Sequence, residues 1–188
     1  VYTAQAFGLD LNFRSPQGMF AQGNMLYICD TGNNRIVQLE RTGTEQFEVA
    51  RIFDSIRGEK GEEKLSGPTD IAVSEDGDIF ISDNGNARIV KVDSDLNFLL
   101  QFNLPVDSTV SADSTFQPSK IVIDTAGRVY CIATSINQGL CKYEADGTFS
   151  GFVGATPVTF NWMDYIWKKF ATQEQRVRMT SFVPTAYD

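Results

Sequence analysis

Histidine is absent from this sequence of 188 residues, and its absence removes several classes of site. A Ser–His or Cys–His nucleophile pair, a histidine general base and a histidine-ligated zinc ion all require that side chain. The side chains that remain for catalysis are carboxylates, Lys, Tyr and three cysteines. An odd number of cysteines without close spacing favours neither a disulfide framework nor a zinc site.

Positive charge and long apolar runs are also scarce. The chain has 16 Lys and Arg against 24 Asp and Glu, which gives a net charge of −8. Such a chain repels phosphate backbones, so the sequence argues against a nucleic-acid partner. No apolar run approaches the roughly 18 residues of a membrane span, and the first residues lack the pattern of a signal peptide. A hydrophobic content of 42% predicts one globular domain over residues 1–188.

Three segments of the chain repeat one pattern. Each has a proline, a short apolar strand, a turn with Gly, a second strand, a polar loop, a third strand such as "RIVQL" or "RIVKV", and an aromatic-rich fourth strand. The prolines Pro16, Pro68 and Pro118 are separated by 52 and 50 residues. Four short strands in such a period are typical of a β-propeller blade. The predicted fold is therefore all-β, with blades at about residues 15–53, 67–103 and 117–153.

Two of these copies carry a more specific pattern. The segments "SPQ…LYICDTGNNRIVQL" and "GPTDIAVSEDGDIFISDNGNARIVKV" resemble NHL repeats, and the likeness extends over about residues 15–153. The matching signature residues are Asp30, Asn33, Arg35, Asp83, Asn86 and Arg88. Their recurrence at one repeat position favours Asp–Arg pairing and loop capping over a reactive site. In the third copy Ala133 replaces the aspartate and Gly139 replaces the arginine.

Three blades do not close a ring, because closed propellers typically have four to eight. With about 50 residues per blade, a six-bladed ring needs roughly 300 residues. The sequence therefore predicts about half of a six-bladed propeller, with the start of a further blade at residues 183–188. The alternative, for a chain that truly has this length, is a homodimer of two half-rings.

Residues 161–180 depart from the period and have the spacing of a short helical insertion. In an up-and-down blade the tight Gly turns share one face, here the turn face, and the longer loops share the opposite loop face. Long connections often carry function, so the loop face and the insertion are the predicted binding surface. The candidate ligand or partner residues are Asp70, Asn84, Lys120, Trp162, Tyr165, Trp167, Lys168 and Lys169.

The resemblance implies a non-catalytic scaffold that binds a protein or a carbohydrate, on a bacterial protein that is extracellular or tethered to the outer face of a membrane. The alternative function is that of a six-bladed hydrolase similar to calcium-dependent lactonases. Asp70, Asn84 and Asp83 would then contribute to a Ca²⁺ site that missing blades complete. No other cofactor is expected. Amidating lyases of similar fold need histidine, which argues against that activity here.

The three cysteines lie in predicted repeat strands. Cys29, Cys131 and Cys141 occupy positions where other copies carry Ser82, Ile81 and Val90, so we expect small core residues. Cys131 and Cys141 are candidates to lie opposite each other across a hairpin. Sequence spacing does not establish the geometry that a bond between them requires.

Overall fold

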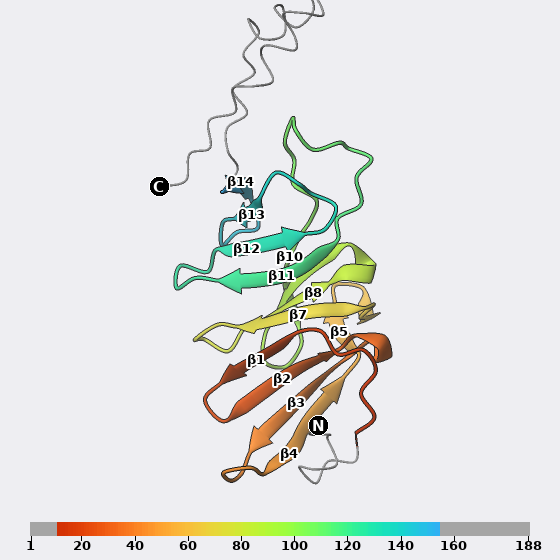
Figure 1. Ribbon diagram of the computed structural model, residues 1–188, viewed down its shortest axis with the longest axis vertical. Helices are drawn as coiled ribbons and strands as arrows, with labels where there is room; N and C mark the ends of the chain where they lie inside the picture. Colours follow the sequence, from red (N-terminus) through yellow and green to blue (C-terminus); the bar gives the residue numbers. More distant parts are fainter. Residues whose placement is uncertain (1–10, 155–188) are drawn as a thin grey trace, which may run out of the picture. The chain divides into compact units, whose positions relative to one another are not determined.

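The computed structural model describes residues 11–154, which form an almost entirely β structure. Three four-stranded antiparallel sheets and one two-stranded hairpin follow one another along the chain (Figure 1). This arrangement confirms the predicted all-β fold class and is a partial β-propeller, in which each sheet is one blade. Within this part of the chain no helix is long and apolar enough to cross a membrane.

Each blade has its strands in chain order from one edge to the other. Blade 1 consists of β1 (Met19–Gln22), β2 (Met25–Asp30), β3 (Arg35–Arg41) and β4 (Phe47–Phe53). Blade 2 consists of β7 (Pro68–Val73), β8 (Ile79–Asp83), β9 (Arg88–Val92) and β10 (Phe98–Phe102). Blade 3 consists of β11 (Pro118–Ile123), β12 (Val129–Ala133), β13 (Leu140–Tyr143) and β14 (Phe149–Val153).

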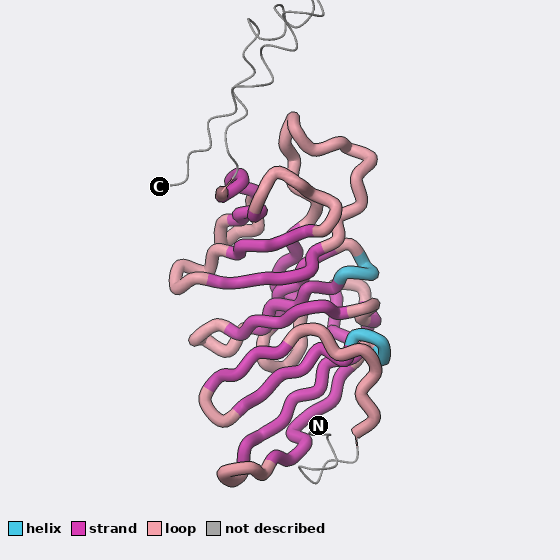
Figure 2. The backbone as a smooth tube through the Cα atoms, in the orientation of Figure 1, coloured by secondary structure: helices cyan, strands magenta, loops and turns pink. Residues whose placement is uncertain are grey.

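Tight turns join the first two strands of every blade on the turn face. Gly23, Gly77 and Gly127 have φ values of 59°, 88° and 75°, a region that glycine enters at little steric cost. Proline begins β7 and β11, where its missing N–H removes no essential ladder bond. On the opposite loop face, short 3₁₀ turns at Thr31–Asn33 and Asn84–Asn86 join the second and third strands of blades 1 and 2 (Figure 2).

The core lies between the blades. One buried cluster joins blades 1 and 2 through residues such as Ile36, Ile71 and Ile81. A second joins blades 2 and 3, where the ring of Tyr143 packs edge-on against Phe102 at 5.6 Å between centroids. Because β7 lies between blades 1 and 3, all six of its residues are buried. Stacking of one blade on the next thus buries the apolar faces of the sheets, which a single four-stranded sheet cannot do alone.

The outer face of blade 3 is apolar and exposed in the described part of the chain. Ile132, Leu140 and Val153 are 49%, 37% and 42% exposed. The residues at the same repeat positions of blade 2, which are Ser82, Ile89 and Phe102, are all 0% exposed because blade 3 covers them. Blade 3 therefore presents the kind of surface on which neighbouring blades stack in this fold.

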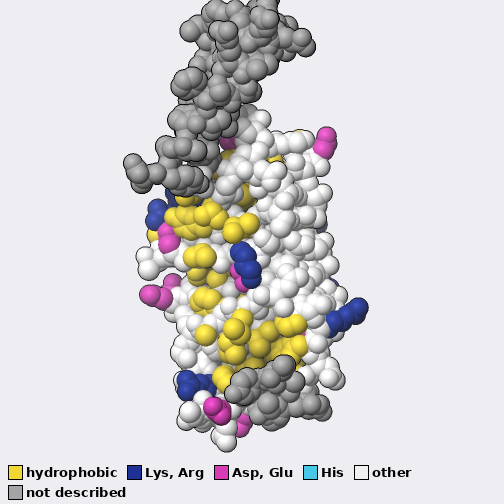
Figure 3. All heavy atoms as spheres, in the orientation of Figure 1, with side chains coloured by type: hydrophobic (Ala, Val, Ile, Leu, Met, Phe, Trp, Pro, Cys, Tyr) yellow, Lys and Arg dark blue, Asp and Glu magenta, His cyan; other side chains and the backbone are white. Residues whose placement is uncertain are grey.

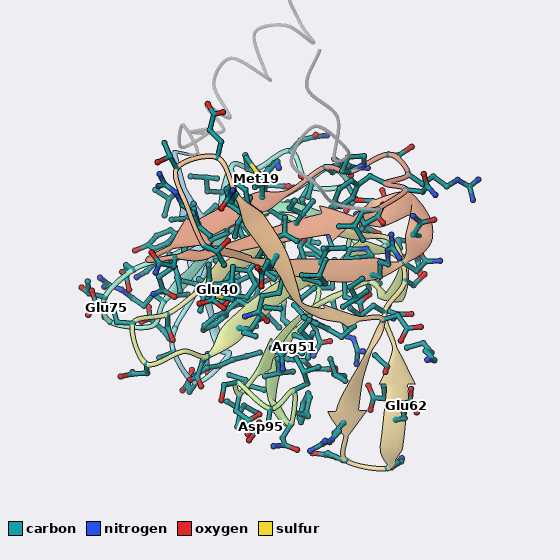
Figure 4. All side chains as sticks on the ribbon, turned by 90° about the horizontal axis from the view of Figure 1, so that it is seen from below. Met19, Glu40, Arg51, Glu62, Glu75 and Asp95 are labelled. Atoms are coloured by element: carbon teal, nitrogen blue, oxygen red, sulfur yellow. The ribbon has the colours of Figure 1, made fainter. Side chains whose placement is uncertain are left out.

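The charged segment between blades 1 and 2, which falls between the predicted blades at about 15–53 and 67–103, is a hairpin. Strands β5 (Ser55–Gly58) and β6 (Gly61–Lys64) pair antiparallel. Ile56 is only 1% exposed and anchors the hairpin, and Arg57 donates its backbone N–H to the carbonyl of Leu96 at 2.8 Å. The hairpin tip stands out from the blades, as the position of Glu62 shows in Figure 4. Only one buried side chain and the glycines Gly58 and Gly61 mark this hairpin in the sequence, which is too weak a pattern to predict it.

Other predictions fall outside the described residues. These are the helical insertion at 161–180 and the start of a further blade at 183–188. The division of the chain into one domain over residues 1–188 and the number of blades in a complete ring stay predictions.

The contact between the inner strands of blades 1 and 2 requires a glycine. A Cβ at Gly18 would lie 2.6 Å from the carbonyl oxygen of Thr69 and 2.6 Å from the Cα of Asp70. We expect Gly18→Ala to lower the free energy of unfolding by about 1–3 kcal/mol, because backbone has to move. Gly43→Ala is the control, since its Cβ would meet only the flexible side chain of Gln46. Urea denaturation of both variants tests this, and equal stability would contradict the close approach.

Candidate functional site

The signature aspartate of blade 1 binds three groups in the loop and in the segment that leads into the blade. Asp30 is fully buried. Its Oδ2 accepts hydrogen bonds from Asn33 Nδ2 at 2.8 Å and Arg35 Nε at 2.6 Å. Its Oδ1 accepts the backbone N–H of Arg14 at 2.7 Å. The carboxylate therefore clamps the lead-in segment to the end of β2.

Blade 2 repeats this clamp atom for atom. Asp83 Oδ2 accepts hydrogen bonds from Asn86 Nδ2 at 2.8 Å and Arg88 Nε at 3.0 Å, while Oδ1 accepts the backbone N–H of Ser66 at 2.8 Å. Arg88 Nη1 also pairs with Glu63 Oε2 of the hairpin at 2.6 Å. Burial of Arg88 opposes its charge, but the hydrogen bonds and charges of Glu63 and Asp83 outweigh burial and raise the pKa of the guanidinium.

The loop after each aspartate also reaches the next blade. Thr31 Oγ1 donates to the carbonyl of Pro68 at 2.7 Å, and Asn84 Nδ2 donates to the carbonyl of Pro118 at 2.9 Å. These two donors occupy the same repeat position. The signature residues thus serve blade assembly, because their donors and acceptors are engaged by the protein itself.

Blade 3 has lost the polar clamp. Ala133 takes the place of the aspartate, and Ile136, which is buried, takes the place of the asparagine. Ser135 stands where Gly32 and Gly85 allow the lead-in segment to approach closely, and its buried hydroxyl has no hydrogen-bond partner. An apolar contact has therefore replaced a charged one in this loop.

The candidates Asp70, Asn84 and Lys120 meet around the first half of β11. Asp70 is 7% exposed, and its Oδ2 accepts the backbone N–H of Ile121 at 2.9 Å. Lys120 Nζ lies 3.5 Å from Asp70 Oδ1 and 3.5 Å from the carbonyl oxygen of Gln17. Lys120 thereby reaches from blade 3 to blades 1 and 2 at the inner edge of the sheets. The side chain of Lys120 remains 54% exposed, so its ammonium is accessible.

The cysteines are buried and free. Cys131 and Cys141 lie directly opposite each other on β12 and β13. Burial raises the pKa of the Cys29 thiol, and the charge of Asp70 raises it further. Burial also raises the pKa of Cys141 to about 11. Thiolates are the reactive form of cysteine, so these side chains behave as core residues.

Two grooves were not foreseen from the sequence. The outer groove runs between the β5–β6 hairpin and β10, and it consists of two adjoining hollows of about 450 and 380 Å³ that share Glu63 and Gln101. The axial groove, of about 410 Å³, is lined by the strands and turns of blades 2 and 3 and by β1 of blade 1. Figure 3 shows apolar side chains along these inner strands and acidic ones at the turns. Neither groove follows from one motif, because each is formed by segments far apart in the sequence.

The remaining candidates Trp162, Tyr165, Trp167, Lys168 and Lys169 lie outside the described residues. Between residues 11 and 154, the structure has no group of three or more Cys, Asp or Glu side chains placed to hold a metal ion.

The repeated blades and their clamps define a β-propeller repeat protein. The family model for the NHL repeat matches residues 65–92, so the chain contains an NHL repeat in blade 2. A probable peptidyl-α-hydroxyglycine α-amidating lyase from Caenorhabditis elegans is 27% identical over 141 residues, which cover 74% of this chain and 39% of the relative. The absence of histidine from this sequence argued against the activity of amidating lyases.

A solved structure shows the same fold. A virginiamycin B lyase from Staphylococcus aureus with quinupristin has a TM-score of 0.50 at 16% identity, over 75% of this chain and 42% of that one. A streptogramin B lyase has a TM-score of 0.49 at 24% identity, over 77% of this chain and 42% of that one. The chain thus spans about two fifths of the length of the proteins it matches.

Removing the clamp of blade 2 tests its structural role. We expect Asp83→Ala to lower the free energy of unfolding by about 2–4 kcal/mol, since it removes the fully buried acceptor of Arg88, of Asn86 and of the backbone N–H of Ser66. Arg128→Ala, which removes a partly exposed pair with Asp124, is expected to cost under about 1 kcal/mol. Thermal and urea unfolding measure both, and an unchanged stability of Asp83→Ala would refute the structural role.

Proposed function

We propose that these blades belong to a non-catalytic binding scaffold and that the outer groove holds a carbohydrate chain. The observation that carries this proposal is the lining of the groove by side-chain amides. Gln101 and Asn103 line the groove and bond to each other, Gln101 Nε2 to Asn103 Oδ1 at 2.9 Å, which leaves the amide of Asn103 an N–H donor and the amide of Gln101 a carbonyl acceptor for hydroxyl groups. Asn86 and Arg88 also line the groove, but Asp83, Glu63 and the carbonyl of Lys64 already engage their side chains, so the amides of Gln101 and Asn103 are the groups available to a ligand.

The charges and shape of the outer groove fit an uncharged polar ligand. Glu59 and Glu63 stand against Lys60, Lys64 and Arg88, so the two signs nearly balance. The partly buried ring of Phe98 adds an apolar surface of the kind on which sugar rings pack. The groove begins at the loop face, which is the face favoured by the length of its connections. This ligand class agrees with the extracellular location that the family resemblance implies.

A glycan array tests the proposal directly. We expect the whole chain to bind a subset of neutral oligosaccharides, and Gln101→Ala with Asn103→Ala to weaken that binding at least about tenfold, because several hydrogen bonds to hydroxyls are lost. The control variant Asn24→Ala with Gln46→Ala removes two amides from the turns of blade 1. Absence of all glycan binding, or equal loss in both variants, would overturn a carbohydrate site in this groove and leave a protein as the partner to test.

An enzyme is the second candidate, and the identity of 27% to an amidating lyase favours it. A calcium-dependent hydrolase is less well supported, because Asn84 donates to Pro118 and Asp70 lies next to the ammonium of Lys120. A cation beside a carboxylate disfavours binding of a second cation there. Either activity would need groups from outside the described residues.

Incubation with a peptidyl-α-hydroxyglycine separates the scaffold from the lyase. We expect no peptide amide above the buffer background, since the chain has no histidine to act as a base. Mass spectrometry of the product, with the Asp70→Ala variant as a second sample, measures this. Formation of the amide by the unmodified chain would establish an enzyme in place of a scaffold.

A further inference from the structure

The axial groove combines an apolar floor with an acidic rim. Its floor includes Phe20, Val73 and Phe80, and it is flanked by Met19 of β1 and Val122 of β11. Met19 is 67% exposed and Val122 is 65% exposed, although both belong to inner strands. A ligand that removes such exposed apolar side chains from water lowers the free energy of the system, which favours binding.

The rim carries four carboxylates, of which two have a cationic partner within residues 11–154 and two do not. Asp78 pairs with Lys91 at 2.8 Å, and Asp124 pairs with Arg128 at 2.7 Å. Glu75 and Asp76, at the tip of the β7–β8 turn, are exposed and have no ion pair in this part of the chain. Glu75 points away from the blades in Figure 4. Two uncompensated negative charges therefore stand at the mouth of an apolar groove.

This combination selects the chemistry of a ligand. The charges repel phosphate groups and acidic sugars and attract ammonium or guanidinium groups. A metal ion does not explain the groove, because its floor is hydrocarbon and a hard cation takes oxygen ligands. A peptide that alternates basic and apolar side chains satisfies both parts, with the cations at the rim and the apolar side chains on the floor.

We propose that the axial groove binds a basic, apolar peptide segment of a partner protein, with a Lys or Arg side chain at Glu75 and Asp76 and a neighbouring apolar side chain between Met19 and Val122. This site is on the turn face, away from the amides of the outer groove, and it does not depend on the proposed carbohydrate. Charge complementarity raises the association rate, and burial of apolar surface supplies affinity.

Fluorescence anisotropy with two labelled heptapeptides tests the proposal on the whole chain. The probe is Gly-Lys-Leu-Lys-Leu-Lys-Gly, and its counterpart has Glu in place of Lys. We expect binding of the basic peptide alone, weakened at least about tenfold by Glu75→Lys with Asp76→Lys, because the attraction becomes repulsion. The matched control Glu45→Lys with Glu48→Lys makes the same charge change on blade 1 and is expected to alter affinity by less than about threefold, since long-range attraction is screened.

Equal loss in both double variants would show attraction to the net charge alone and would overturn the site. Binding of the acidic peptide, or of neither peptide, would overturn it as well. A second measurement needs no variant of the rim: ¹³C-methyl labelling of methionine places probes at Met19 in the groove and at Met25 on β2. The Met19→Leu variant assigns the Met19 resonance. A shift of this resonance on addition of the basic peptide supports binding in the axial groove. A shift of the Met25 resonance without one at Met19 refutes it.

Discussion

The buried carboxylate at the end of the second strand is the interaction on which the blade assembly depends. An ionised side chain with no exposed surface is costly unless its lone pairs are satisfied. Asp30 and Asp83 meet that demand with an asparagine amide, an arginine and a backbone N–H of the lead-in segment. Because one acceptor group holds the turn, the third strand and the incoming chain, it fixes where blades 1 and 2 begin. The residue after it then bonds the anchor proline of the next blade.

Blade 3 shows that the arrangement tolerates an apolar substitute in one copy. Ala133 and Ile136 remove a charge that would otherwise need partners, and replacing a complete buried polar network by packed apolar groups is often close to neutral in stability. The cost is visible at Ser135, whose buried hydroxyl is unsatisfied and which occupies the position of the close-approach glycines. The residues that match the NHL family model, 65–92, include the complete clamp of Asp83, Asn86 and Arg88.

The sequence was a good guide to the blades and a poor guide to the surfaces. A period of about 50 residues, the prolines and the Asp–Gly turns are local signals, and they indicate blades without knowledge of distant contacts. The hairpin depends on one buried side chain, Ile56, and on a backbone bond to Leu96, so its pairing is set by tertiary contact. The axial groove joins residues as far apart as Met19 and Gly127. Such a surface has no signature in any one stretch of sequence.

The two grooves differ because the two ends of a blade are built differently. At the loop face the charged signature residues pair with one another. The outer groove beside the hairpin is therefore lined by amides and by charges of both signs that nearly balance. At the turn face the chain needs only small turns, which place Asp and Glu at their tips without any duty in the clamp. Two of them, Glu75 and Asp76, have no ion pair within residues 11–154, and they lie beside inner strands with exposed apolar side chains. One repeat thus yields a nearly neutral polar surface at one end of the blades and an acidic apolar one at the other.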